Sequence, residues 1–242
     1  MEKKGAGHVE MIISFIIFVG FLIFIFSIFN PFNTDSNVTL VDNVFTNLEE
    51  NLTTKLSSVS VSLNSEKRCI ILNNFKEILD DMGCPSQIDG KINVKNKNEE
   101  NVRYNYDNNN KKLYLEINPP EKFFTISCSE DISTTENTIG CSESTSNYGV
   151  GIIIERKVWS KRRIEEFKRN YETDYLNLKR RIIPEGNDFG FQLWDIDNTL
   201  SPEIEAGKPP SRVRVNAKTI PIDVLEIERG DVKKRTLTII VW

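Results

Sequence analysis

One uncharged apolar run near the N-terminus constrains this chain more than any other feature. From Met11 to Phe29 the sequence contains no charged residue, and its polar side chains are those of Ser14 and Ser27. A helix over this run would rise roughly 28 Å at about 1.5 Å per residue, which is close to the thickness of a hydrocarbon core. Pro31 follows, and proline cannot continue a helix. We therefore predict a transmembrane helix here.

Two other interpretations fit the same run. One is a buried core helix, although such a helix usually has an apolar stripe rather than apolar residues on every face. The other is a cleaved secretory signal, whose apolar region usually has ~7–15 residues and ends at a small-residue cleavage site. Lys3 and Lys4 precede the run. By the positive-inside rule they predict a single-pass protein with a cytoplasmic N-terminus and an extracytoplasmic head at the cell membrane.

The residues just before the run form a second pattern. Lys3 and Lys4 are followed directly by Gly5 and Ala6, and then by Glu10. This pattern resembles the class III signal peptide of prepilin-like proteins, archaeal type IV pilin-like proteins in particular. The resemblance implies that a prepilin peptidase cuts between Gly5 and Ala6 and that the apolar helix is retained. It also implies that Glu10 pairs with the new α-amino group of a neighbouring subunit, where the two charges would offset each other's desolvation.

We expect an α+β fold in which the N-terminal transmembrane helix precedes a β-rich extracytoplasmic head with a few helices. Apolar residues recur every fourth position after the run and predict an amphipathic stalk helix, whereas alternating apolar residues further on predict strands, most clearly a hairpin over 102–117. The expected segments are a leader over 1–5, a transmembrane or assembly helix over 6–32, the stalk helix over 33–57, a β-rich subdomain over 58–147 and a β-α-β subdomain with a C-terminal hairpin over 148–242.

The four cysteines predict disulfides rather than a metal site. Pairing Cys69 with Cys84 and Cys128 with Cys141 is the simplest of three connectivities. An exported protein permits disulfides. A zinc site would need closely spaced ligands such as C-x₂-C, and the only histidine, His8, lies at the opposite end of the chain. We therefore expect no metal and no cofactor.

Other polar residues allow two interpretations each. Asn37 and Asn51 begin N-x-T triplets, which are acceptors for N-glycosylation in exported chains but are also common by chance. A predicted helix from Ser160 to Arg181 carries eight basic residues, which suit either an anionic polymer or a solvated face with interleaved acids. An acidic segment after the next predicted strand could bind calcium or form a polar loop. Its members are Asp195, Asp197, Asn198, Glu203 and Glu205.

The sequence has no catalytic signature and a formal net charge of −4, which argues against a mainly nucleic-acid-binding protein. The head has no histidine, which excludes the usual Ser-His-Asp and Cys-His arrangements, whereas its many carboxylates leave a glycosidase-like pair open. We expect a non-enzymatic structural or adhesive surface protein, a minor pilin or pseudopilin of a type IV pilus-like system. Its expected partners are the prepilin peptidase, membrane lipid and other pilin-like subunits. The alternatives are a monomeric anchored ligand-binding protein and, third, an anchored hydrolase.

Overall fold

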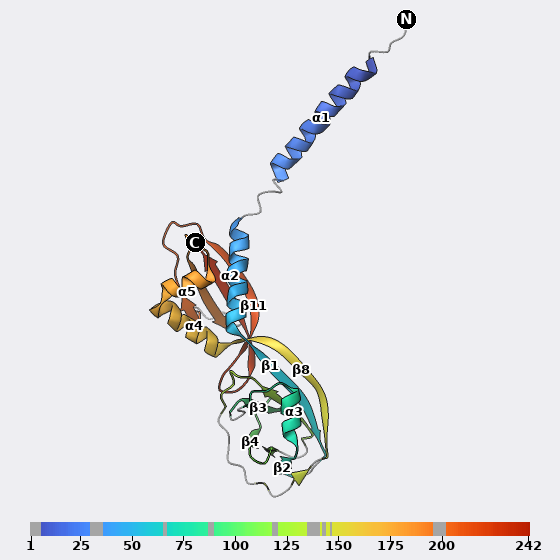
Figure 1. Ribbon diagram of the computed structural model, residues 1–242, viewed down its shortest axis with the longest axis vertical. Coiled ribbons are helices and arrows are strands. Elements are labelled where there is room, and N and C mark those ends of the chain that lie inside the picture. Colours follow the sequence, from blue (N-terminus) through green and yellow to red (C-terminus); the bar gives the residue numbers. More distant parts are fainter. Residues whose placement is uncertain are drawn as a thin grey trace.

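Two long antiparallel strands, β1 (Thr53–Leu63) and β8 (Tyr148–Ser160), run through the structure and join its two lobes (Figure 1). The structure is a computed structural model that describes residues 6–29, 36–64, 67–86, 90–117, 121–134, 141, 144–145, 147–195 and 202–242. The alternation expected after residue 57 is confirmed, because Val59, Val61 and Leu63 of β1 are buried while the serines between them are not.

These two strands lie in the middle of an eight-stranded sheet with the order β10-β9-β12-β11-β8-β1-β6-β3. Its other members are β3 (Ile92–Asn96), β6 (Phe123–Cys128), β9 (Phe189–Asp195), β10 (Ile204–Ala206), β11 (Asn216–Leu225) and β12 (Val232–Val241). All neighbours are antiparallel except β11 and β8, which are parallel and share only two residue pairs, Val224 with Trp159 and Leu225 with Ser160. The sheet is weakly joined at this point, which we call the waist.

The helical lobe is built on β9 to β12. Three helices cover one face of this half of the sheet: α2 (Ser36–Leu52), α4 (Lys161–Thr173) and α5 (Tyr175–Ile182) (Figure 1). Val44 and Leu48 of α2 are fully buried in one cluster with Phe189 and Phe191, and each such side chain contributes about 1.5–3 kcal/mol by burial.

The helix expected over 33–57 is shorter in the structure. It ends at Leu52, and Leu56, the last residue of the expected apolar stripe, lies in β1. Thr53 and Thr54 are β-branched, which favours a strand, and they pair with β8 opposite Trp159 and Val158.

The sandwich lobe packs a second sheet against the other half of the first, which is formed by β8, β1, β6 and β3. The second sheet has the order β4-β5-β2-β7 and consists of β2 (Cys69–Leu72), β4 (Arg103–Asp107), β5 (Lys112–Glu116) and β7 (Ser144–Thr145). α3 (Phe75–Asp81) adds Phe75 and Leu79 to the buried cluster between the sheets. The predicted hairpin over 102–117 is confirmed by β4 and β5, in which Tyr104 lies opposite Leu115.

Two disulfides cross-link the sandwich lobe, Cys69–Cys141 and Cys84–Cys128. The prediction of disulfides is confirmed, but the pairing of neighbours along the sequence is wrong. β2 begins at Cys69 and pairs in parallel with β7, so that the segment before β7, which holds Cys141, returns beside the start of β2. Proximity in the folded sheet therefore decides the connectivity.

The N-terminal helix α1 (Ala6–Phe29) corrects the expected fold class. Among the residues that the structure describes, no helix is both long enough and apolar enough to cross a membrane. The transmembrane helix expected as the first part of the fold is therefore wrong, and the fold is a β-rich α+β arrangement around the eight-stranded sheet. The side chains of α1 are described from Glu10 to Ile25.

Candidate functional site

The residues expected to direct processing and assembly lie at the start of the chain. Gly5 is outside the described residues, and Ala6 is the first residue of α1. Glu10 lies one turn further along α1 with its side chain exposed. It is the only charged residue between Ala6 and Phe29.

The two glycosylation candidates lie on α2. The side chain of Asn37 is outside the described residues, whereas Asn51 is exposed near the C-terminal end of the helix. Its Nδ2 donates a hydrogen bond to the Asn47 carbonyl over 2.6 Å. Thr53, the third residue of that triplet, is buried, and its Oγ1 donates to the Glu49 carbonyl over 2.6 Å. In the folded chain the threonine of the Asn51 triplet is therefore buried and already hydrogen-bonded.

The acidic segment considered for calcium binding contacts a cation of the protein instead. Arg235 is only 6% exposed, and its guanidinium contacts Asp195 at 2.8 Å, Glu203 at 3.0 Å and Glu226 at 3.1 Å. Asp197 and Asn198 lie outside the described residues. Glu205, the fifth member of that segment, accepts a hydrogen bond from Gln192 and forms an ion pair with Lys208. Within the described ranges no group of three or more metal-binding side chains comes together.

Lys161 completes this network. Its Nζ lies 2.7 Å from Glu203 and 3.1 Å from Glu226. Burial by itself would lower the pKa of Lys161, but the hydrogen bonds that its ammonium donates to the two carboxylates, together with their negative charges, outweigh it, and the pKa is raised. Burial likewise would raise the pKa of Glu203, but Lys161 and Arg235 outweigh it, and the pKa of this carboxyl is lowered. Both groups are therefore held in their charged forms.

The waist holds a second buried ion cluster, centred on Asp131. The side chain of Asp131 is fully buried and forms ion pairs with Arg162 and Arg163, the latter over 2.7 Å from Nε. Arg163 also donates from Nη1 to the Thr53 carbonyl over 2.8 Å. Because Thr53 begins β1 and Asp131 lies just after β6, one arginine of α4 links the helical lobe to the sandwich lobe.

The position of Arg162 and Arg163 in the first turn of α4 explains why an acid lies beside them. Ser160, at which the sequence predicts the helix to begin, caps it, and its Oγ accepts from the Arg163 N–H over 3.3 Å. Cations in the first helical turn are unfavourable because the helix dipole is positive there. Asp131 compensates Arg162 and Arg163, as Glu203 and Glu226 compensate Lys161. Lys161, Arg162 and Arg163 are therefore paired with acids of the protein itself.

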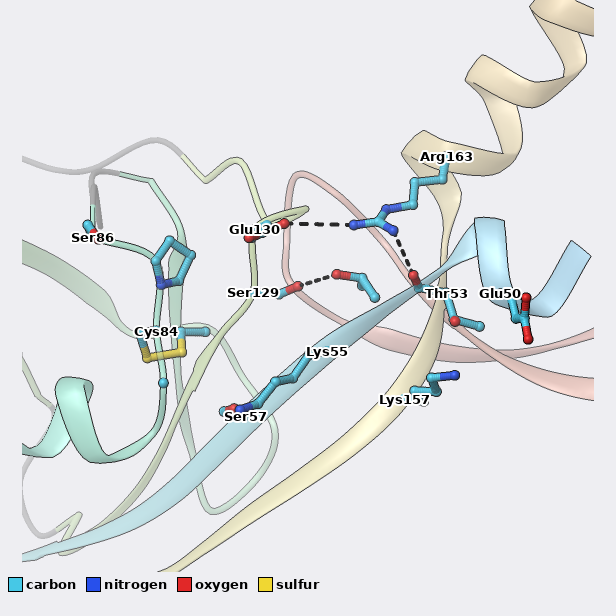
Figure 2. Close-up of a pocket in the computed structure, with 14 residues that line it drawn as sticks. Glu50, Thr53, Lys55, Ser57, Cys84, Ser86, Ser129, Glu130, Lys157 and Arg163 are labelled. Atoms are coloured by element: carbon cyan, nitrogen blue, oxygen red, sulfur yellow. Dashed lines mark hydrogen bonds and ion pairs between the residues drawn. A yellow bond between two sulfur atoms is a disulfide. The ribbon is translucent and has the colours of Figure 1, made fainter. Parts of the chain in front are cut away.

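A cavity of about 510 Å³ opens beside the Asp131 cluster (Figure 2). Its walls come from the end of α2, the start of β1, the Cys84–Cys128 disulfide, the loop after β6, and the neighbouring strand β8. Three cations face it, Lys55, Lys157 and Arg163, against the two carboxylates Glu50 and Glu130. Its volume lies within the range of about 300–1,000 Å³ that is typical of small-molecule sites.

Most polar groups of this cavity are held by neighbours. Figure 2 shows Arg163 pointing across to the Thr53 carbonyl and toward Glu130. The distance between the Arg163 guanidinium and the Glu130 carboxylate is 3.8 Å. Lys55 pairs with Glu155 at 2.5 Å. Lys157 has no ion-pair partner within the described residues, so it is the cation that a bound molecule would meet. The cavity offers hydroxyls, ammonium groups and the carboxylates of Glu50 and Glu130.

Sequence reasoning missed both Asp131 and the cavity. The available signal was the run Lys161-Arg162-Arg163 directly after a helix cap, because three cations at that end of a helix require nearby acids. Which acids supply them depends on the loop after β6, which is far away in the sequence. Compared with known proteins, the chain matches no family model and no curated protein significantly.

Proposed function

We propose that this protein is a prepilin-like structural or adhesive subunit, a minor pilin or pseudopilin, which assembles through α1 in a type IV pilus-like system. The exposure of α1 carries the proposal. Large apolar side chains point outward around its whole circumference, among them Met11, Phe15 and Phe24. Monomeric soluble proteins rarely expose contiguous apolar patches of more than a few hundred Å². This surface therefore requires an apolar partner, and α1 of another subunit provides one.

Glu10 supports the same proposal. It places a single carboxylate in the apolar surface of α1, close to the helix N-terminus, where a negative charge is favourable. Packing between helices would remove this carboxylate from water, which is costly unless a cation accompanies it. Cleavage before Ala6 would create an α-amino group with the required charge on a neighbouring copy.

The two disulfides support a location for the head. Disulfides persist in oxidising compartments and are rare in the cytosol of most organisms. Both bonds lie in the sandwich lobe and involve all four cysteines of the chain. We therefore place the head outside the cytoplasm, at the cell surface.

The first test is the N-terminal sequence and intact mass of the protein isolated from its native cells. Processing at the proposed site gives a chain that starts at Ala6 and retains α1. A chain that still starts at Met1, or one that has lost α1 entirely, would remove the basis for prepilin-like assembly.

The second test separates assembly from simple association of an apolar helix. Glu10→Ala should abolish cross-linked multimers in cells, because subunits lose the charge that sets their relative position. Ser14→Ala is the matched control, since it removes another exposed polar group from the same helix. Equal multimer yields from the two variants would contradict the proposed role of Glu10.

Binding of a small polar ligand is the second candidate function, and the cavity beside the Asp131 cluster favours it. Lys157 and the hydroxyls around it suit a molecule with a carboxylate, such as an acidic sugar. The test is a thermal shift of the full-length chain with galacturonic acid, with glucose as the neutral control and Lys157→Ala as the variant. A shift that is equal for both sugars, or that persists in Lys157→Ala, would argue against a site in this cavity.

A further inference from the structure

Strand β8 has an open edge along most of its length. One side of β8 pairs with β1 from Tyr148 to Trp159. The other side pairs with β11 only through Trp159 and Ser160 at its C-terminal end. Between residues 148 and 158, no strand in the described part of the chain pairs with that second side. A row of backbone N–H and C=O groups at such an edge can pair with another strand.

The side chains along this edge are unusually apolar for a position without cover. Ile152 is 83% exposed and Ile154 is 58% exposed. Ile154 lies opposite Ser58 of β1, on the outer face of the sheet, and Phe123 of β6 is exposed as well. The segment from Gly149 to Ile154 contains no charge. Single exposed apolar residues are common, but two large ones beside an unpaired strand edge mark a surface for association.

Two features that usually protect an edge occur in β8, one at an end of the open edge and one near its middle. Edge strands are commonly protected by charges and by bulges. In β8 the charges of Glu155, Arg156 and Lys157 lie at one end of the open edge. The pairing with β1 is irregular between Val59 and Val61, opposite the segment around Gly151. Ile152 lies within this irregular segment and Ile154 just beyond it, and both side chains remain exposed beside the open edge.

We propose that β8 pairs antiparallel with β8 of a second copy of this chain, about a two-fold axis at Ile153. The midpoint of the open edge, from 148 to 158, is Ile153, so a pair centred there uses the whole edge of both copies. Ile152 then lies opposite Ile154 of the second copy, and the same contact occurs twice by symmetry. Such directly opposite apolar pairs are the units that stabilise a sheet.

The charges of β8 favour this register. With the axis at Ile153, the charged segment 155–157 of each copy lies opposite the uncharged segment 149–151 of the other, and no like charges face each other. An axis at Arg156 would place that residue against itself, and like charges directly opposite are destabilising. The sequence of β8 therefore suits pairing with β8 of a second copy, and this pairing needs no other protein.

Cysteine cross-linking tests the register directly. All four native cysteines are in disulfides, so an introduced cysteine is the only thiol. Full-length Ile152→Cys and Ile154→Cys chains with different tags are mixed in detergent and oxidised. The mixture should give a cross-linked dimer at several times the yield of either variant alone. Thr125→Cys is the matched control, because Thr125 is exposed on β6, an inner strand of the same sheet.

A yield from the mixture no higher than that from Thr125→Cys would overturn the proposal, as would cross-links only to a different protein in cells. Ile154→Lys provides an independent test. By symmetry each substitution acts twice, and about 1.4 kcal/mol lost in each copy weakens the dimer about a hundredfold. Ile154→Lys should therefore reduce the dimer measured by analytical ultracentrifugation, whereas Thr125→Lys should not. An unchanged Ile154→Lys dimer would refute the β8 pairing.

This pairing is independent of the proposed assembly through α1. A Glu10→Ala chain should keep the specific cross-link between Ile152→Cys and Ile154→Cys copies while it loses the multimers that depend on Glu10. Loss of the cross-link in a Glu10→Ala chain that still forms multimers would contradict both proposals.

Discussion

The buried Asp131 offers the sharpest test of how the two lobes hold together. In Asp131→Ala, Arg162 and Arg163 lose their buried partner, and removal of one member of a buried ion pair commonly costs about 3–5 kcal/mol. The two arginine side chains are 43% and 30% exposed, so water compensates part of this loss. We therefore expect the unfolding free energy to fall by about 2–3 kcal/mol, at or just below the lower end of that range.

The assay is urea unfolding of the full-length chain in mild detergent, followed by tryptophan fluorescence and far-UV circular dichroism. Glu130→Ala is the matched control. Its carboxylate is 74% exposed and lies 3.8 Å from Arg163, so it should change stability by no more than about 0.5 kcal/mol. A double-mutant cycle of Asp131→Ala with Arg163→Ala should give a coupling of at least about 1 kcal/mol. Equal effects of Asp131→Ala and Glu130→Ala would refute the view that Asp131 joins the lobes.

Two further expectations follow from the same structure. Replacement of Cys84 and Cys128 by serine removes a bond that closes a sequence separation of 44 residues, and chain entropy predicts a loss of about 4 kcal/mol in urea unfolding; a loss below about 1 kcal/mol would contradict this value. The pKa of Glu203 is lowered in the folded state from its ordinary 4.5, so its stabilisation is present above pH 4.5 and lost as the pH falls below it. Glu203→Gln should therefore flatten the decline of the urea midpoint between pH 5 and about pH 3, and an unchanged decline would argue against this role.

Local patterns of the sequence predicted the individual elements better than their connections. The alternation of Val59, Val61 and Leu63 and the hairpin over 102–117 follow from side-chain periodicity, which the two faces of a strand impose directly. The cap at Ser160 follows from hydrogen bonding within one helical turn.

The parts that sequence reasoning missed depend on contacts between distant segments. The disulfide partners are 72 and 44 residues apart, and a parallel pairing of β2 with β7 brings Cys69 beside Cys141. Asp131 meets Arg162 and Arg163 only because β6 and α4 both end or begin at the waist. Side-chain periodicity does not predict such contacts, because they are set by the order of strands in the sheet rather than by local geometry.

The nested disulfides have a mechanical consequence. Cys69–Cys141 encloses Cys84–Cys128, and its sequence separation is 72 residues. If tension were applied between the two ends of this chain and the lobes were pulled open, that enclosed length could not extend. At about 3.4 Å per extended residue it corresponds to about 240 Å of contour, which is released in full only when both bonds are reduced. Under load, the sandwich lobe would therefore act as a short, stiff link, and a reductant would convert it into a long, compliant one.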